Sequence, residues 1–232
     1  MAKPTLLLTR PEPGAQRFAA RLSDATRARV DIMIAPLLEI VPTGATWDPS
    51  AVAGVIFTSV NGVNLAGPGD GQPAYCVGES TAHAAKCANW RVLETATTAE
   101  ALIDRISQAN PAVPLIHLAG RCRRGDISER LSAQGIATSV LTLYDQRACT
   151  LNEAARTALQ APTIAPLFSP RTALLLTQQE LSLRNVHVIA LSPAVADSLS
   201  GQDLHKCDTL PEPRGDLMLA AVEKLCAGTT MP

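Results

Sequence analysis

The sequence predicts an α/β fold. Short apolar stretches alternate with segments of helical periodicity along most of the chain, and this alternation is typical of parallel sheets covered by helices on both faces. Hydrophobic residues make up 47% and charged residues 18% of the 232 residues, which is a globular composition. Because only 3% are aromatic, aliphatic side chains must fill the core.

The N-terminal half shows the alternation clearly. Residues 5–10 (TLLLTR) predict a strand. The helix expected after it carries apolar residues at i, i+3, i+4 and i+7, namely Ala15, Phe18, Ala19 and Leu22. Four more strands are expected at residues 55–59, 75–78, 91–94 and 114–120.

Helix signals follow these strands. Thr97 and Glu100 have the spacing of a capping box, and the inner face of that helix is expected to hold Ala99, Leu102, Ile103 and Ile106. Another helix is expected to end at Gly135. The C-terminal part adds strands at 166–169 and 187–192, and a last helix with Met218, Ala221, Val222 and Leu225 on one face.

Two extended segments, 32–42 and 138–148, interrupt the alternation and bracket a long block. They predict one lobe inserted into another, with the two segments as a connecting two-stranded antiparallel β ladder. Lobe 1 would comprise 1–31 plus 149–232, and lobe 2 would comprise 43–137. We expect each lobe to be a flavodoxin-like parallel sheet flanked by helices, with a cleft between the lobes.

Charge and cysteine usage exclude several classes of protein. The net charge of −1 argues against nucleic-acid binding through a positive field. Six cysteines without a C-x-x-C pair are expected to be reduced thiols, mostly filling the core, since a chain of this size needs no disulfides. Cys76, His83 and Cys87 match no common zinc spacing, so no metal site is expected.

We also expect a cytoplasmic protein without a membrane span. The N-terminal segment has three consecutive leucines, whereas the apolar part of a signal peptide needs about 7–15 residues. No apolar run approaches the roughly 20 residues that span a bilayer.

Ser59 and Ser169 each follow a buried-looking strand and precede a turn and a helix. Ligands of open parallel sheets bind beyond the carboxyl ends of the strands, where free helix amides favour anions. The serines are therefore helix caps, with or without a ligand contact. Arg10 is either a surface charge or a ligand contact, and the loop 121–124 is either solvated or an anion clamp. Tyr144 is by default a half-buried strand aromatic.

The order and spacing of the motifs resemble those of the uroporphyrinogen-III synthase family over nearly the full length. The motifs are "LLLTRPEPGAQRFAARL", "PLLEI", "VIFTSVNGV", "YCVGESTAHAA", "LAGRCRRGDISERLSAQG", "VLTLYDQR", "LFSPRTA" and "VIALSPAVADSL". The resemblance implies two α/β lobes joined by a two-stranded ladder. It implies an enzyme of heme (tetrapyrrole) biosynthesis that cyclises hydroxymethylbilane, inverting ring D and losing water, to give uroporphyrinogen III. It implies no cofactor and no metal.

The resemblance also implies roles for individual residues. Tyr144 is the candidate catalytic residue, as the proton donor to the departing hydroxyl. The substrate-binding candidates are Arg10, Ser59, Thr81, Gly120, Arg124 and Ser169. The chain departs from the family pattern at Val195, where a Thr is common, and in the loop 121–124, which is more basic than usual.

Such an enzyme needs no catalytic dyad, because its linear substrate cyclises unaided to the wrong isomer. Catalysis by positioning explains why polar groups at strand ends suffice. We expect the linear tetrapyrrole as the partner molecule, a possible hand-over from the upstream hydroxymethylbilane synthase, and a monomer that binds neither nucleic acid nor membrane.

Three alternatives remain open from the sequence. The first is a non-catalytic two-lobe protein that binds an anionic small molecule, although a periplasmic one would need an export signal. The second is a weak or inactive synthase-like protein that binds tetrapyrroles as a sensor. The third is a flavodoxin-type oxidoreductase, for which the sequence lacks a clear phosphate loop.

Overall fold

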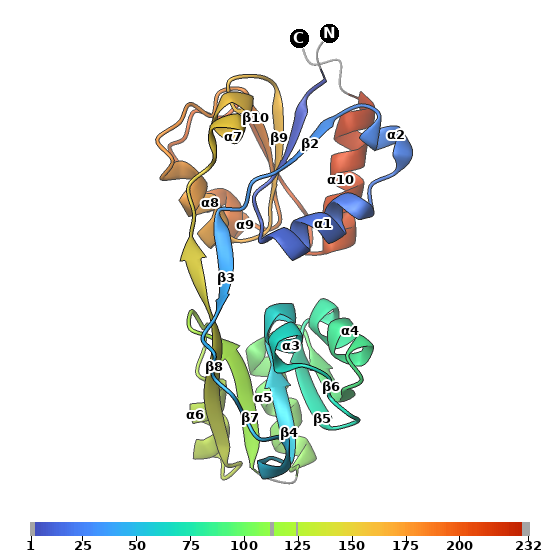
Figure 1. Ribbon diagram of the computed structural model, residues 1–232, viewed down its shortest axis with the longest axis vertical. Coiled ribbons are helices and arrows are strands. Elements are labelled where there is room, and N and C mark those ends of the chain that lie inside the picture. Colours follow the sequence, from blue (N-terminus) through green and yellow to red (C-terminus); the bar gives the residue numbers. More distant parts are fainter. Residues whose placement is uncertain (1–2, 112–113, 124, 229–232) are drawn as a thin grey trace. The chain divides into compact units, whose positions relative to one another are not determined.

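The computed structural model describes residues 3–111, 114–123 and 125–228 (Figure 1). The chain divides into two compact units. Unit 1 comprises Met1–Glu39 and Arg147–Pro232, and unit 2 comprises Ile40–Gln146. The chain passes between the units within β3 (Leu38–Pro42) and β8 (Thr138–Ala148), which are neighbouring strands.

Unit 1 contains a five-stranded parallel sheet in the order β11-β10-β9-β1-β2. The strands are β1 (Thr5–Leu8), β2 (Asp31–Ile34), β9 (Thr163–Leu167), β10 (Val186–Ala190) and β11 (Lys206–Thr209). If the five strands are renumbered 1 to 5 along the chain, the sheet has the order 2-1-3-4-5 when it is read from β2 to β11. This is the strand order of flavodoxin. The chain first adds β2 on one side of β1 and then continues on the other side with β9.

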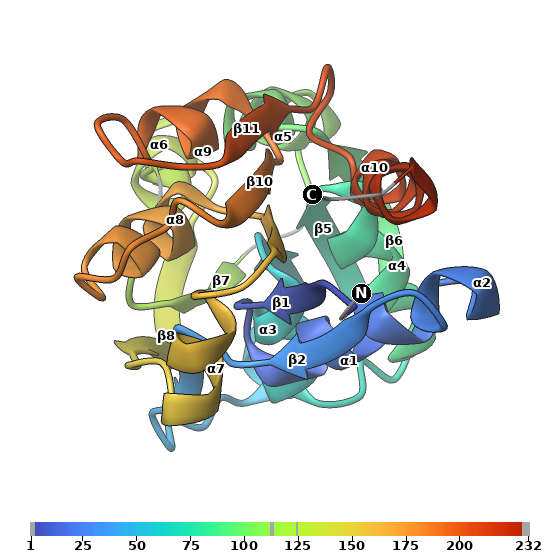
Figure 2. The ribbon, with the colours of Figure 1, turned by 90° about the horizontal axis from the view of Figure 1, so that it is seen from above.

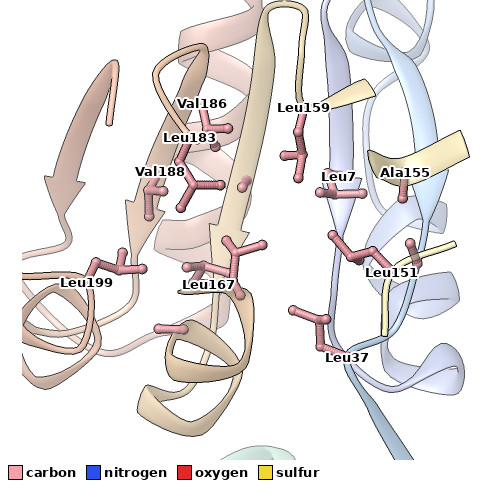
Figure 3. Close-up of a cluster of buried hydrophobic side chains, with 14 of the residues drawn as sticks. Leu7, Leu37, Leu151, Ala155, Leu159, Leu167, Leu183, Val186, Val188 and Leu199 are labelled. Atoms are coloured by element: carbon pink, nitrogen blue, oxygen red, sulfur yellow. The ribbon is translucent and has the colours of Figure 1, made fainter. Parts of the chain in front are cut away.

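Helices cover both faces of this sheet (Figure 2). One face carries α1 (Glu12–Ala20) and α10 (Gly215–Gly228), and the other carries α7 (Glu153–Ala158), α8 (Pro170–Thr177) and α9 (Pro193–Asp197); the short α2 spans Asp24–Arg27. Because successive strand residues point to opposite faces, Leu6 packs with α1 and α10, while Leu7 packs on the other side among the leucines and valines of Figure 3.

Unit 2 contains a six-stranded mixed sheet in the order β3-β8-β7-β4-β5-β6. Its other strands are β4 (Gly54–Phe57), β5 (Pro73–Val77), β6 (Arg91–Ala96) and β7 (Leu115–Gly120). The five strands from β8 to β6 run parallel. If these five strands are renumbered 1 to 5 along the chain, starting at β4, the sheet has the order 3-2-1-4-5 when it is read from β6 to β8. This is the order of the other common doubly wound sheet.

Strand β3 runs antiparallel to β8. The Thr43 amide donates to the Leu143 carbonyl at 2.9 Å, and the Cys149 amide donates to the Leu37 carbonyl at 2.9 Å. Residue numbers therefore rise along one strand as they fall along the other, which is the antiparallel pattern.

Helices cover both faces of the unit 2 sheet as well. A 3₁₀ turn, η1 (Pro49–Ala51), precedes β4. Helices α3 (Val60–Ala66) and α4 (Glu79–Cys87) pack on one face, and α5 (Ala99–Ala109) and α6 (Ile127–Ala133) pack on the other. The predicted inner face of α5 is confirmed at Leu102, Ile103 and Ile106, which are all buried.

Several local expectations need correction. The segment 32–42 is not one extended strand, because β2 pairs with β1 in unit 1, and Pro36, which has no amide hydrogen, separates it from β3. The cap of α5 is Thr98, whose hydroxyl accepts from the Ala101 amide, and not Thr97. The predicted lobe boundaries and the cleft between the lobes stay predictions.

The cysteines are free but do not mainly fill the core. Cys76 and Cys226 are buried, whereas Cys87, Cys122 and Cys207 are exposed and Cys149 is intermediate. Among the described residues, no helix is long and apolar enough to cross a membrane.

The core of unit 2 gives a direct test of the fold. Leu102 is completely buried, whereas Leu93 of the same unit is 45% exposed. We expect Leu102→Ala to lower the free energy of unfolding by about 2–5 kcal/mol, and the matched Leu93→Ala to change it by about 0.5 kcal/mol or less. Urea unfolding followed by circular dichroism measures both, and equal losses would contradict the assigned core.

Candidate functional site

Each sheet reverses its strand order beside the first strand of its unit. The reversal lies between β1 and β9 in unit 1 and between β4 and β7 in unit 2. Ligands of doubly wound sheets bind outside the carboxyl ends of the strands at such switch points. Four predicted site residues stand at these ends, namely Arg10 after β1, Ser169 after β9, Ser59 after β4 and Gly120 at the end of β7.

Ser59 and Tyr144 meet at the switch point of unit 2. Ser59 is the N-cap of α3, and its Oγ accepts from the Asn61 amide at 3.2 Å. The Ser59 side chain also interacts with the Tyr144 hydroxyl and favours its ionised form. The two residues lie 85 positions apart in the sequence (144 − 59), so only the folded sheet brings them together.

Gly120 leaves the space that the Tyr144 ring occupies. The two residues are partners in the β7–β8 ladder, just after a register shift between Ala119 and Gly120. A Cβ on Gly120 would lie 2.5 Å from Cε2 and 2.6 Å from Cζ of Tyr144. Since the ring occupies that space, only glycine fits there. We call Ser59, Gly120 and Tyr144 the unit 2 group.

Burial controls the protonation of Tyr144, whose side chain belongs to the core beneath α3 and α4. Burial raises the pKa of its phenol above the ordinary value of about 10, the interaction with the Ser59 side chain acts in the opposite direction, and Cys122 adds a smaller upward effect. The phenol is therefore protonated at neutral pH and holds a proton that it can donate.

Thr81 lies at the end of the next strand along the sheet. It is a buried residue in the first turn of α4, after Gly78, and its amide donates to the Gly78 carbonyl at 3.1 Å. Among the hydrogen bonds of the described residues, none joins Thr81 to Ser59 or Tyr144. The structure thus places it at the same edge of the sheet, but outside the unit 2 group.

In the basic loop 121–124, Arg121 is held against β8. Arg121 Nε donates to Asp145 Oδ2 at 2.8 Å, and the Arg121 amide donates to the Tyr144 carbonyl at 2.8 Å. Its guanidinium is thus bound to β8, beside Tyr144. Arg124, predicted to bind substrate, lies outside the described residues.

At the switch point of unit 1, Arg10 holds a half-buried positive charge. Its Cζ lies 4.3 Å from the centroid of the Phe168 ring, a cation–π contact. On another side it contacts α1, where a Cβ on Gly14 would come within 2.7 Å of Nε. Burial lowers the pKa of Arg10, and the Arg17 charge lowers it further. No carboxylate of the described residues forms an ion pair with Arg10.

Ser169 follows directly after Phe168 and caps α8. Its Oγ accepts from the Thr172 amide at 3.1 Å and lies 2.9 Å from the Thr172 hydroxyl. Phe168 packs edge-on against Phe18 of α1 at 5.4 Å between centroids. The structure thus places Arg10 against the ring of Phe168 and Ser169 next to Phe168 in the chain.

Val195 and His117 are both buried. Val195, where the family often has Thr, is buried in the core cluster that contains Leu7. His117 escaped prediction, although a histidine in the apolar strand "PLIHLAG" was a visible signal. No group of three or more metal-ligating side chains is found in the described part of the chain.

Comparisons with known proteins agree with this picture. The family model described as "Uroporphyrinogen-III synthase HemD" matches residues 17–217. A uroporphyrinogen-III synthetase from Helicobacter pylori has the same fold, with 16% identity and a TM-score of 0.66 over 97% of this chain and 100% of that one.

A mutant uroporphyrinogen III synthase from the extremely thermophilic bacterium Thermus thermophilus is also similar in fold, with 13% identity and a TM-score of 0.55 over 97% of this chain and 100% of that one. A search of curated protein sequences finds no match. Because the family model spans most of the 232 residues, the chain belongs to the uroporphyrinogen-III synthase family, a family of cyclising lyases.

Proposed function

We propose that this chain performs its family's reaction through the residues at its two switch points. It cyclises hydroxymethylbilane with inversion of ring D and loss of water, giving uroporphyrinogen III. The observation that carries the proposal is the buried, protonated Tyr144, whose ring fills the space beside Gly120 and whose hydroxyl interacts with the Ser59 side chain. This is a proton donor held at the edge of the sheet where ligands bind.

Tyr144 acts as the general acid. Its phenol gives a proton to the departing hydroxyl of the substrate, and the carbon–oxygen bond breaks as water leaves. The proton that the last pyrrole releases when the ring closes returns to the phenolate, so the enzyme ends as it began. Ser59 fixes the direction of the phenol, and positioning of the chain selects the carbon that is attacked.

Arg10 binds a carboxylate of the substrate. A half-buried guanidinium stacked on Phe168 and lacking an ion pair with any described carboxylate is ready for an anionic ligand, which it can bind through two parallel hydrogen bonds. We further propose that Thr81, Gly120, Arg124 and Ser169 bind substrate, by their resemblance to family positions.

The wider setting is part of the same proposal. We propose a cytoplasmic monomer that receives its substrate from the upstream hydroxymethylbilane synthase and that uses neither a cofactor nor a metal. The mechanism above agrees with this, since each step needs only a proton donor and groups that hold carboxylates.

A product-isomer assay tests the proposed function. Freshly generated hydroxymethylbilane is given to the purified protein after chelation of metals, and the oxidised porphyrins are separated by isomer. We expect isomer III to dominate. Isomer I alone, formed at the rate seen without protein, would contradict the proposal and favour a synthase-like protein that binds tetrapyrroles without turnover.

The proton-donor role predicts that Tyr144→Phe lowers kcat by about a hundredfold, which lies within the range of general acid catalysis. The matched control is Tyr75→Phe, which removes the hydroxyl of the other buried tyrosine of unit 2 and should keep the wild-type kcat. Steady-state kinetics of isomer III formation measures both. A Tyr144→Phe variant with the wild-type kcat would show that Tyr144 is no acid catalyst.

The carboxylate-binding role predicts that Arg10→Met raises KM by roughly tenfold or more, since a hydrogen bond to a charged group contributes about 1.5–3 kcal/mol. Methionine keeps an apolar contact with Phe168. Arg17→Met is the control, because it removes the same charge from an exposed position of α1 and should leave KM within about twofold. Equal KM values for the two variants would rule out a substrate contact at Arg10.

A further inference from the structure

His117 is a polar residue in an otherwise apolar strand. It lies in β7 between Ile116 and Leu118 and is 3% exposed. Its Nε2 lies 3.2 Å from Thr58 Oγ1, while Nδ1 is buried and has no hydrogen-bond partner in the described structure. An unpartnered buried polar atom destabilises a fold, so this histidine calls for an explanation beyond packing.

The two nitrogens indicate which tautomer is present. Orphaned buried N–H groups are rarer than under-satisfied acceptors, which places the proton on Nε2. His117 then donates to the Thr58 hydroxyl and leaves Nδ1 as a bare acceptor. The pKa of His117 is lowered to about 4, mainly by burial and to a smaller extent by the Arg123 charge, while Glu129 opposes the shift. The imidazole is therefore neutral at neutral pH.

The contact of His117 bears on the unit 2 group. Thr58 directly precedes Ser59, which caps α3 and whose side chain interacts with the Tyr144 hydroxyl. The neighbouring residue of β7 packs closely against the start of α3, because a Cβ on Gly62 would lie only 2.8 Å from the Leu118 carbonyl oxygen. Strand β7 thus contacts the β4–α3 turn through the His117 side chain and packs against the first turn of α3 through the backbone of Leu118.

We propose that His117 is a positioning residue of the synthase reaction, which acts through Thr58 to hold Ser59 where it orients the Tyr144 hydroxyl. The inference rests on the proposed function of Tyr144. His117 does not itself touch the reacting atoms. Its hydrogen bond to Thr58 restricts the motion of the β4–α3 turn. The unpartnered Nδ1 lowers the stability of the fold, and this is the cost of keeping a hydrogen-bond donor at this point of the sheet.

The test combines four variants of unit 2. His117→Leu removes the donor at similar volume, His117→Gln retains an amide N–H, Thr58→Val removes the hydroxyl at constant shape, and the fourth is the double variant His117→Leu with Thr58→Val. We expect each apolar single variant to lower kcat about three- to tenfold, the effect of one hydrogen bond, with KM within about twofold. The double variant should fall no further, and His117→Gln should regain most of the loss.

The matched control is His187→Leu, which makes the same change at a buried strand histidine of unit 1, bonded to Asp208. It should leave kcat unchanged even where thermal unfolding shows a loss of stability. Wild-type kcat in folded His117→Leu or in Thr58→Val, or additive losses in the double variant, would overturn the positioning role. If His117→Leu does not fold, the kcat values of Thr58→Val and His117→Gln test the positioning role instead.

A spectroscopic readout separates this inference from the proposed function. The protein has two tyrosines, Tyr75 and Tyr144, so their ¹³Cζ resonances can be assigned with Tyr144→Phe. We expect Thr58→Val to shift the Tyr144 resonance and His117→Gln to leave it close to its wild-type position. The Tyr75 resonance should not move in either variant. This result is independent of turnover. An unmoved Tyr144 resonance overturns the inference, whereas absence of isomer III from wild type overturns the proposed function.

Discussion

The reversal of strand order beside β1 and β4 is the constraint on which the candidate site depends. Once a parallel sheet grows on both sides of its first strand, the connections at the reversal leave in opposite directions and the strand ends between them stay uncovered. Arg10 and Ser169 stand at one such place, and Ser59 and Gly120 stand at the other. Two sheets of different order, built from one chain, thus present polar residues at equivalent points.

Within unit 2 the missing side chain of Gly120 has the largest consequences. It admits the Tyr144 ring over the end of β7, and the ring brings its hydroxyl to Ser59. The backbone of Arg121 then holds the Tyr144 carbonyl, and its guanidinium holds Asp145. Burial keeps the phenol protonated. The packing that fixes the ring thus also keeps Tyr144 in the protonated form that a general acid requires.

Much of this was predictable because its causes are local. The alternation of strands and helices, the caps Ser59 and Ser169, and the inner face of α5 follow from spacing alone. The errors arise where neighbours in space decide. The segment 32–42 forms two strands and not one, because its first part pairs with β1 in unit 1. His117 passed unnoticed because its partner Thr58 lies 59 residues away in the sequence. Exposed Cys87, Cys122 and Cys207 likewise carry no local signal of exposure.

A crystal structure of the protein with uroporphyrinogen III bound under reducing conditions tests directly whether the switch point of unit 2 is the reaction site. We expect the product to lie against the carboxyl ends of β4 and β7, with the Tyr144 hydroxyl in contact with it and Ser59 beside that hydroxyl. A bound product that leaves Tyr144 and Ser59 uncontacted would contradict the assignment of the switch point as the reaction site.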